Sequence, residues 1–302
     1  MDIPAYIEGD EHGWQLQIKK LNEIKEKKVF LLNAEKVIPK VLPTDQTICY
    51  RCTPANKKEI VQIFKEKSSA LTLAVGDGAN DVNMITAADV GIGIRGKEGT
   101  EAARVADFVA GEFKFIRLLT LYYGREWYRK NCELANYSFF KNWFHVAAVV
   151  AFGGFSYFSG VTIFNVFLYE LFNVIYSSWP IILWAVFDEE HTFKESKDFP
   201  SLYSPGISNA HFNQSRFLRS VGLAILYGVT SLLVIINIME TKVLDSTGTI
   251  GGLNLSGSIL FAAIIIIVNL KILVMTTGVK PLLLIMTLLS IAIYWPSEAI
   301  YA

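Results

Sequence analysis

Five long apolar segments fill the carboxyl-terminal half of this chain, and they restrict its possible folds more than any other feature. They cover residues 136–160, 163–187, 217–239, 255–276 and 281–300. A helix needs about 20 mostly apolar residues to cross the hydrocarbon core of a bilayer. Segments of this length and number exceed what the core of a soluble protein uses, so buried soluble helices are the weaker alternative. The sequence predicts an α-helical transmembrane bundle of about five spans.

Charged residues are concentrated outside these segments. Residues 1–135 contain 39 of the 56 charged side chains, and the chain as a whole is neutral, with 28 basic and 28 acidic residues. This balance argues against nucleic acid as a partner, because nucleic-acid binding relies on a broad basic surface. Basic residues flank the first span and the loop between the second and third spans. The spans predict an integral, multi-pass membrane protein, and by the positive-inside rule we expect its head to be cytosolic. The expected location is the plasma membrane or an endomembrane.

The charged head alternates short apolar runs with helical segments. Four runs have the length of buried strands: 29–32, 47–50, 71–75 and 90–94. Thr53 followed by Pro54 is typical of a helix start, and a helix is expected from there to Lys67. Cys49 and Cys52 have no second ligand pair at zinc spacing, which favours reduced thiols over a zinc site. The alternation predicts an α/β fold with a parallel sheet and a functional site at the carboxyl ends of its strands.

The predicted strand at 71–75 is followed by ten residues, 76–85, that are rich in glycine, carboxylates and amides. Glycines allow the backbone to turn tightly and to approach a phosphate group. Carboxylates are hard oxygen ligands that suit Mg²⁺, and an amide can donate to a phosphoryl oxygen without adding negative charge. A capped turn with solvated acids is the alternative, and the length of the string favours the phosphate and metal site. The residues concerned are Gly76, Asp77, Gly78, Asn80 and Asp81.

The string at 76–85 resembles the hinge motif of P-type ATPases, which belong to the haloacid-dehalogenase-like phosphotransferases. Residues 53–57, Thr-Pro-Ala-Asn-Lys, resemble the lysine motif of the same domain. The resemblance implies that Lys57 neutralises an aspartyl phosphate, that Asp77 binds Mg²⁺, and that Asp81 supports the metal. It also implies catalytic roles for Lys57, Asn80 and Asp81, and it assigns Thr53, Gly76 and Gly78 to the phosphate loop.

The form of the hinge motif is similar to that of the phospholipid-flippase branch, class IV, whereas cation pumps usually have Val and Pro within it. Further matches include Lys141-Asn142, 172–175, Trp179-Pro180, 186–188 and 268–271. The chain is therefore identified as a member of that branch. The resemblance implies part of an ATP-driven translocase that moves phospholipid between leaflets through an aspartyl-phosphate cycle. It further implies Mg²⁺ and ATP as cofactors, with ATP bound mainly by other domains, and a small glycosylated beta subunit as partner.

Ionisable residues within membrane spans are costly and usually functional, which draws attention to Lys141 in the first predicted span. The resemblance places Lys141 on the path of the lipid headgroup and suggests Asn142 and Asn173 as further residues of that path. A lysine that reaches toward the membrane surface is the alternative for Lys141. Asn173 and Glu170 can equally hydrogen-bond a neighbouring helix. Pro180 is expected to kink the second span.

The sequence lacks the Asp-Lys-Thr-Gly-Thr string that contains the phosphorylated aspartate of P-type ATPases. We therefore expect a partial phosphorylation domain at 1–112, a stalk helix at 113–135 and a transmembrane domain at 136–302, without nucleotide and actuator domains. Such a chain is expected to be inactive by itself. Two alternatives stay open: a cation-transporting P-type ATPase, for which the spans offer only two carboxylates, and a catalytically inactive, truncated membrane protein.

Overall fold

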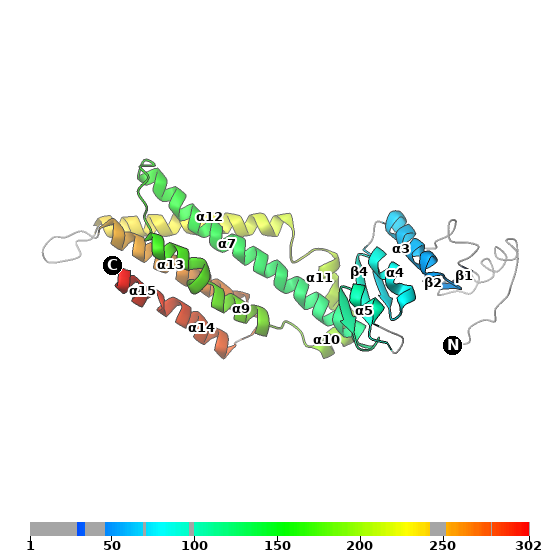
Figure 1. The fold of residues 1–302 in the computed structure, drawn as a ribbon. Coiled ribbons are helices and arrows are strands. Elements are labelled where there is room, and N and C mark those ends of the chain that lie inside the picture. The colour runs from blue at the N-terminus through cyan, green and yellow to red at the C-terminus, as the bar shows by residue number, and fades with distance from the viewer. Residues whose placement is uncertain are drawn as a thin grey trace. The chain divides into compact units, whose positions relative to one another are not determined.

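The computed structural model describes residues 29–33, 46–68, 71–96, 100–241, 252–278 and 280–301 (Figure 1). The chain divides into two compact units, Met1–Ile116 and Arg117–Ala302. Residues 1–28 and 34–45 of the predicted head domain lie outside the described residues. The finer division at 112/113 and 135/136 remains a prediction.

The described part of the first unit contains two small sheets. Its strands are β1 (Val29–Asn33), β2 (Gln46–Tyr50), β3 (Leu73–Gly76), β4 (Val90–Ile94) and β5 (Phe108–Ala110). β1 pairs with β2, and the other sheet has the order β3-β4-β5. Every pairing is parallel, which confirms the predicted parallel sheet. β5 was not predicted, because it has only three residues and two of them are exposed.

Helices alternate with the strands along the chain. Helix α3 (Pro54–Ser68) follows β2 and precedes β3. The short 3₁₀ turn η1 (Ala79–Asp81) and α4 (Val82–Ala87) connect β3 to β4, and α5 (Glu101–Val105) connects β4 to β5. Thr53 begins α3 as predicted, since the Asn56 amide donates to Thr53 Oγ1 at 3.2 Å. Helix α5 lies directly on β4, because a Cβ added to Gly93 would come within 2.7 Å of the Ala103 Cα atom. These close contacts bury Ala74, Ile85 and Ala102.

From Phe115 onward, the described chain is almost entirely helical. The first half comprises α6 (Phe115–Arg117), the π-helical η2 (Leu118–Gly124), α7 (Arg125–Phe155), α8 (Val166–Leu171), the π-helical η3 (Phe172–Tyr176) and α9 (Ser178–Phe187). The second half comprises α10 (Phe193–Asp198), η4 (Pro200–Tyr203), α11 (Ser204–Ile207), α12 (Gln214–Thr241), α13 (Leu253–Met275), α14 (Pro281–Ala292) and α15 (Tyr294–Tyr301).

Four helical segments of the described chain are long and apolar enough to cross a membrane, by length and composition. They are Val166–Phe187, Gln214–Ile238, Leu253–Met275 and Pro281–Tyr301. The predicted first span is not among them, so the count of five spans is not confirmed. Its polar residues, Lys141 and Asn142 among them, lower the hydropathy of α7. Helix α7 also ends at Phe155 and not at residue 160, because Tyr157 and Phe158 have φ values of 51° and 53°, outside the helical region.

The core of the helical unit is rich in aromatic side chains. Helices α7 and α12 lie side by side (Figure 1), and a Cβ at Gly228 would come within 2.6 Å of the Phe144 carbonyl oxygen. A glycine at this position therefore allows the two backbones to approach closely, as small residues do between membrane helices. His145 is buried against the rings of Phe164 and Phe261.

Candidate functional site

The structure brings Lys57 and Asp81 together in the first unit. Lys57 lies in the first turn of α3, and its Nζ donates to Asp81 Oδ1 at 2.6 Å. The other carboxylate oxygen, Asp81 Oδ2, accepts from the backbone amide of Asp77 at 3.2 Å. Burial alone would raise the pKa of Asp81, but the hydrogen bond and charge of Lys57, helped by backbone amides, lower it further than burial raises it. Asp81 is therefore an ionised carboxylate, and each of its two oxygens accepts a hydrogen bond.

The two glycines of this loop differ in their surroundings. A Cβ at Gly76 would lie 2.3 Å from Asp81 Cβ, so only glycine permits Asp81 to pack against the end of β3. A Cβ at Gly78 would have no atom within 4 Å, and its backbone is extended, with φ −123° and ψ 172°. Gly76 is thus required by the fold of the loop, whereas Gly78 leaves an open stretch of backbone.

The remaining residues predicted for the head site lie at the surface. Asp77 and Asn80 follow β3 and are exposed. The Thr53 hydroxyl donates to Asn56 Oδ1 at 2.8 Å in addition to capping α3. Its hydrogen-bonding capacity is therefore largely used within the first turn of the helix.

The donor set for a metal ion in this loop is small. Within the described part of the chain, no three or more His, Cys, Asp or Glu side chains group in a way that could hold a metal ion. Mg²⁺ needs only one or two protein carboxylates when phosphate and water complete its shell. Asp77 fits this requirement as an exposed carboxylate, whereas both Asp81 oxygens already have partners. The loop therefore fits Mg²⁺ through Asp77, with Asp81 holding Lys57 and the loop in place.

In the helical unit, Lys141 lies near the middle of α7, about 24 Å from its start at a rise of 1.5 Å per residue. Its Nζ donates to Ser177 Oγ at 3.0 Å. The same Nζ lies 5.9 Å from the ring centroids of both Tyr137 and Phe172. Among the described residues, Lys141 has no carboxylate at ion-pair distance. A half-buried ammonium group with a hydroxyl and two ring faces around it is suited to an anionic or dipolar ligand.

Ser177 occupies a break in the second apolar helix. The π-helical turn η3 ends at Tyr176, and α9 begins at Ser178. Ser177 Oγ donates back to the Phe172 carbonyl at 2.9 Å, and Ser178 Oγ donates to the Asn173 carbonyl. These serines replace part of the helical hydrogen bonding that is lost at the break. The regular helix is thus interrupted at Ser177, three residues before Pro180, and the kink expected at Pro180 stays a prediction.

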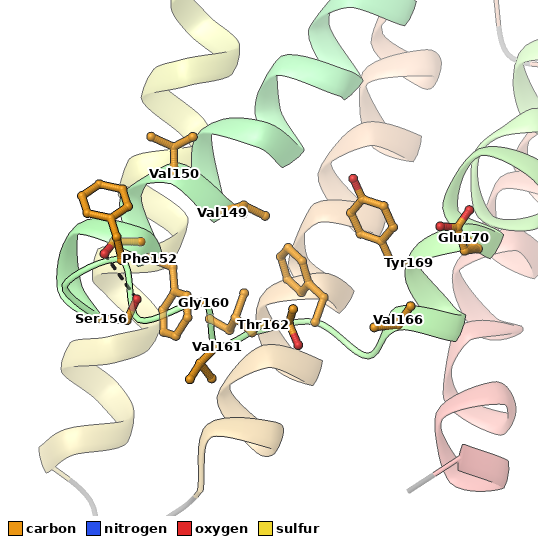
Figure 2. A pocket seen from close by; sticks show the side chains of 14 residues that line it. Val149, Val150, Phe152, Ser156, Gly160, Val161, Thr162, Val166, Tyr169 and Glu170 are labelled. Carbon is orange, nitrogen blue, oxygen red and sulfur yellow. Dashed lines mark hydrogen bonds between the residues drawn. The ribbon is translucent and has the colours of Figure 1, made fainter.

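The other residues predicted for the lipid path are exposed on the surface of this unit. Asn142 is next to Lys141 on α7, and Asn173 lies within η3. Glu170 lies at the edge of a mostly apolar hollow of about 580 Å³ between the end of α7 and the start of α8 (Figure 2). Of all the described side chains, only Ser177 shares a hydrogen bond with Lys141.

A buried network of charged residues at the start of α7 was not predicted. Arg129 Nη2 donates to Glu126 Oε2 at 2.8 Å and to Asp188 Oδ2 at 2.9 Å. Arg125 donates to Glu126 at 2.8 Å and to Glu190 at 2.5 Å. Burial would raise the pKa of Glu190, but the adjacent Arg125 and Arg129 guanidinium groups lower it overall. The short spacing of Arg125, Glu126 and Arg129 on α7 was a visible signal, but the other two carboxylates, Asp188 and Glu190, are 59 and 65 residues away from their arginine partners in sequence.

The same network connects three parts of the chain. Arg125 Nε donates to the Leu202 carbonyl at 2.8 Å. Asp188 Oδ1 accepts from both the amide and the hydroxyl of Thr277, each at 3.0 Å. Through these hydrogen bonds and ion pairs, the start of α7 is connected to the segment after α9 and, through Asp188, to the turn between α13 and α14.

The described chain combines a small parallel sheet and a glycine- and aspartate-rich loop with a helical unit that contains four candidate membrane-spanning helices. A family model described as phospholipid-translocating P-type ATPase C-terminal matches residues 103–302. This match covers about two thirds of the chain. The chain therefore belongs to the phospholipid-translocating P-type ATPases, which confirms the resemblance found in its sequence.

Curated relatives agree with this assignment. The chain is 38% identical to phospholipid-transporting ATPase ID of Homo sapiens over 178 residues, which are 59% of this chain and 15% of that protein. It is 37% identical to phospholipid-transporting ATPase IC of Xenopus tropicalis over 188 residues, 62% of this chain and 15% of the relative. Identity to phospholipid-transporting ATPase tat-1 of Caenorhabditis elegans is 34% over 224 residues, 74% of this chain and 20% of the relative. The chain thus spans about 15–20% of the length of these relatives.

Proposed function

We propose that this chain acts within an ATP-driven phospholipid translocase that moves lipid between leaflets through an aspartyl-phosphate cycle. The observation that carries the proposal is the family match over residues 103–302. The relatives are named phospholipid-transporting ATPases, and the match includes the helix that contains Lys141. The phosphorylated aspartate, the nucleotide site and the actuator function would be supplied by parts of the pump other than these 302 residues.

In this proposal the first unit is the carboxyl-terminal part of a haloacid-dehalogenase-like phosphorylation domain. Lys57 neutralises the phosphoryl group, and Asp81 holds the lysine in position through the contact at 2.6 Å. Asp77 is the protein ligand of Mg²⁺, which when bound would neutralise charge on the phosphoryl oxygens. The open backbone at Gly78, the exposed Asn80 and the helix start at Thr53 face the incoming group. Gly76 makes the close packing of Asp81 possible.

The helical unit is proposed to supply five spans, with α7 as the first. Arg125 and Arg129 then lie on the cytosolic side, as the positive-inside rule expects, and Lys141 lies within the predicted span 136–160, nearer to its cytosolic end. The lipid headgroup passes Lys141, with Asn142 and Asn173 on the exposed faces of their helices. Residues 113–135 act as the stalk that transmits motion from the head. Support comes from the continuous helix over Arg125–Phe155, which crosses the predicted boundary between stalk and membrane.

The implied partners are phospholipid, the membrane itself, ATP, Mg²⁺ and a small glycosylated beta subunit, with the pump in the plasma membrane or an endomembrane. A cation pump is the second candidate within the superfamily. It is less well supported, because in the described part of the chain Lys141 has a serine and aromatic rings around it and no carboxylate.

The test is ATP hydrolysis by the full-length protein that contains this chain, reconstituted in vesicles with single added phospholipids or with single added metal cations. We expect stimulation by at least one phospholipid class and no cation-specific stimulation beyond Mg²⁺. Asp77→Asn should abolish the lipid-stimulated rate, whereas Glu66→Gln, which removes an exposed head carboxylate on α3, should leave it unchanged. Stimulation by a cation alone, or near-normal turnover of Asp77→Asn, would contradict the proposal.

A further inference from the structure

The break in the second apolar helix has a covalent cause. In an α-helix the Tyr176 carbonyl would accept from the amide four residues later, which is residue 180. That residue is proline, which has no N–H and whose ring clashes with the carbonyl four residues earlier. The Tyr176 carbonyl therefore loses its helical partner in a part of the unit that is fully buried.

Two neighbouring helices supply donors to this single carbonyl. Asn269 Nδ2 of α13 donates to Tyr176 O at 2.8 Å, and Ser290 Oγ of α14 donates to the same oxygen at 2.7 Å. Both side chains are buried, with Asn269 at 0% and Ser290 at 3% exposure. A buried carbonyl without its helical partner must find other donors, and here it has two.

Asn269 is a costly residue in this position. Its amide group also donates to Ile265 O in its own helix at 2.9 Å, while its Oδ1 has no hydrogen-bond partner among the described residues. An apolar residue of similar size would avoid desolvating that oxygen. Among the described residues, the contact with Tyr176 O is the only hydrogen bond of the Asn269 side chain that reaches another helix, so an apolar side chain could not replace it.

The opened turn determines where Ser177 points. Ser177 directly follows Tyr176, is fully buried, and accepts from Lys141 Nζ at 3.0 Å. If the turn closed into a regular helix, the residues after Tyr176 would rotate about the helix axis and Ser177 would change its direction. The donors that hold the Tyr176 carbonyl thus also hold the partner of Lys141.

We infer that Asn269 and Ser290 are positioning residues, which keep the helix open at Tyr176 and thereby set the Ser177 hydroxyl against Lys141. Their effect on transport rests on the proposed function, because only there does Lys141 meet a lipid headgroup. Their effect on the break is independent of any activity.

The break is tested by amide hydrogen exchange over residues 166–187 of the full-length protein in lipid nanodiscs. Asn269→Leu and Ser290→Ala should each speed exchange in this segment about tenfold, the order expected when one buried hydrogen bond is lost. Thr287→Val is the matched control, because its buried hydroxyl donates to Leu283 O within α14 itself at 2.7 Å. Pro180→Ala restores an N–H for Tyr176 and should slow exchange. Unchanged exchange in both Asn269→Leu and Ser290→Ala would overturn the inference.

Lipid-stimulated ATP hydrolysis then separates positioning from mere stabilisation. Asn269→Leu should raise the apparent KM for phospholipid about tenfold with a smaller change in kcat, and Ser290→Thr, which keeps the hydroxyl, should stay near wild type. The double variant Pro180→Ala with Asn269→Leu should assemble even if Asn269→Leu alone does not, because the restored N–H of residue 180 bonds the Tyr176 carbonyl. The apparent KM for phospholipid should stay raised in the double variant, because the closed turn moves Ser177 away from Lys141. A wild-type KM in this double variant would overturn the positioning role. Absence of lipid stimulation in the wild type would instead refute the proposed function and leave the exchange result to decide the inference.

Discussion

Replacing Arg129 by methionine should destabilise the helical unit more than any other single charge removal on α7. Arg129 has 5% side-chain exposure, and its Nη2 bonds both Glu126 and Asp188. Its guanidinium carbon also lies 5.7 Å from the centroid of the Trp184 ring. Methionine leaves the fully buried Asp188 carboxylate with its two bonds to Thr277 and no other hydrogen bond from the described residues. Removing one partner of a buried ion pair costs about 3–5 kcal/mol, because the other charge stays buried without compensation.

The assay is the thermal midpoint of the full-length protein in nanodiscs, followed by size-exclusion chromatography of heated samples. For a unit of this size we expect a decrease of about 6–20 °C for Arg129→Met. Lys130→Met is the matched control, since it removes a positive charge from the next position, where no ion pair is found among the described residues. The double variant Arg129→Met with Asp188→Leu should recover most of the loss, because no buried carboxylate remains at residue 188. Equal, small decreases for Arg129→Met and Lys130→Met would refute this reasoning.

Three further predictions concern close packing and acid stability. Gly76→Ala should lower the unfolding free energy by about 1–3 kcal/mol in a denaturant titration, because the added Cβ would overlap Asp81. Gly78→Ala is the control and should have little effect, so equal losses in the two variants would contradict this prediction. Gly228→Val should reduce the yield of monodisperse protein in detergent, because it separates α7 from α12, and Gly222→Val, with no atom within 4 Å of the added Cβ, should not. The hydrogen bonds from Lys65 and from Thr72, opposed only by slight burial, lower the pKa of Asp89 from 3.8 to about 2. Because the pKa of Asp89 is lower in the folded than in the unfolded protein, its ionised carboxylate stabilises the fold above about pH 4, and this stabilisation is lost as the pH falls toward 2. Asp89→Asn should therefore flatten that part of an acid unfolding curve.

Features that depend on nearby residues were predictable from the sequence. The helix start at Thr53-Pro54 and the strand at 90–94 follow from local residue preferences, and both agree with the structure. The apolar segments from 217 onward match α12, α13 and the pair α14 and α15 closely, because hydropathy reports such helices directly. The ten-residue loop string also indicated its family without any knowledge of contacts.

Features that depend on distant residues were not predictable. Arg129 and Asp188 are 59 residues apart, and no local sequence pattern around either residue predicts that they form an ion pair. The same holds for Asn269, whose motif was noticed in the sequence but whose contact with Tyr176 spans 93 residues. The predicted span at 136–160 is not among the four candidate membrane helices, because Lys141 and other polar residues lower the hydropathy of α7.

The central claim, that this chain works within a phospholipid pump, is tested most directly by following fluorescent phospholipids across the bilayer of proteoliposomes that contain the full-length protein. The account predicts ATP- and Mg²⁺-dependent movement of lipid from one leaflet to the other, which Lys141→Met reduces at least tenfold while Lys130→Met does not. Lipid movement at the same rate with and without ATP, or ATP-dependent uptake of a cation without any lipid movement, would contradict the central claim.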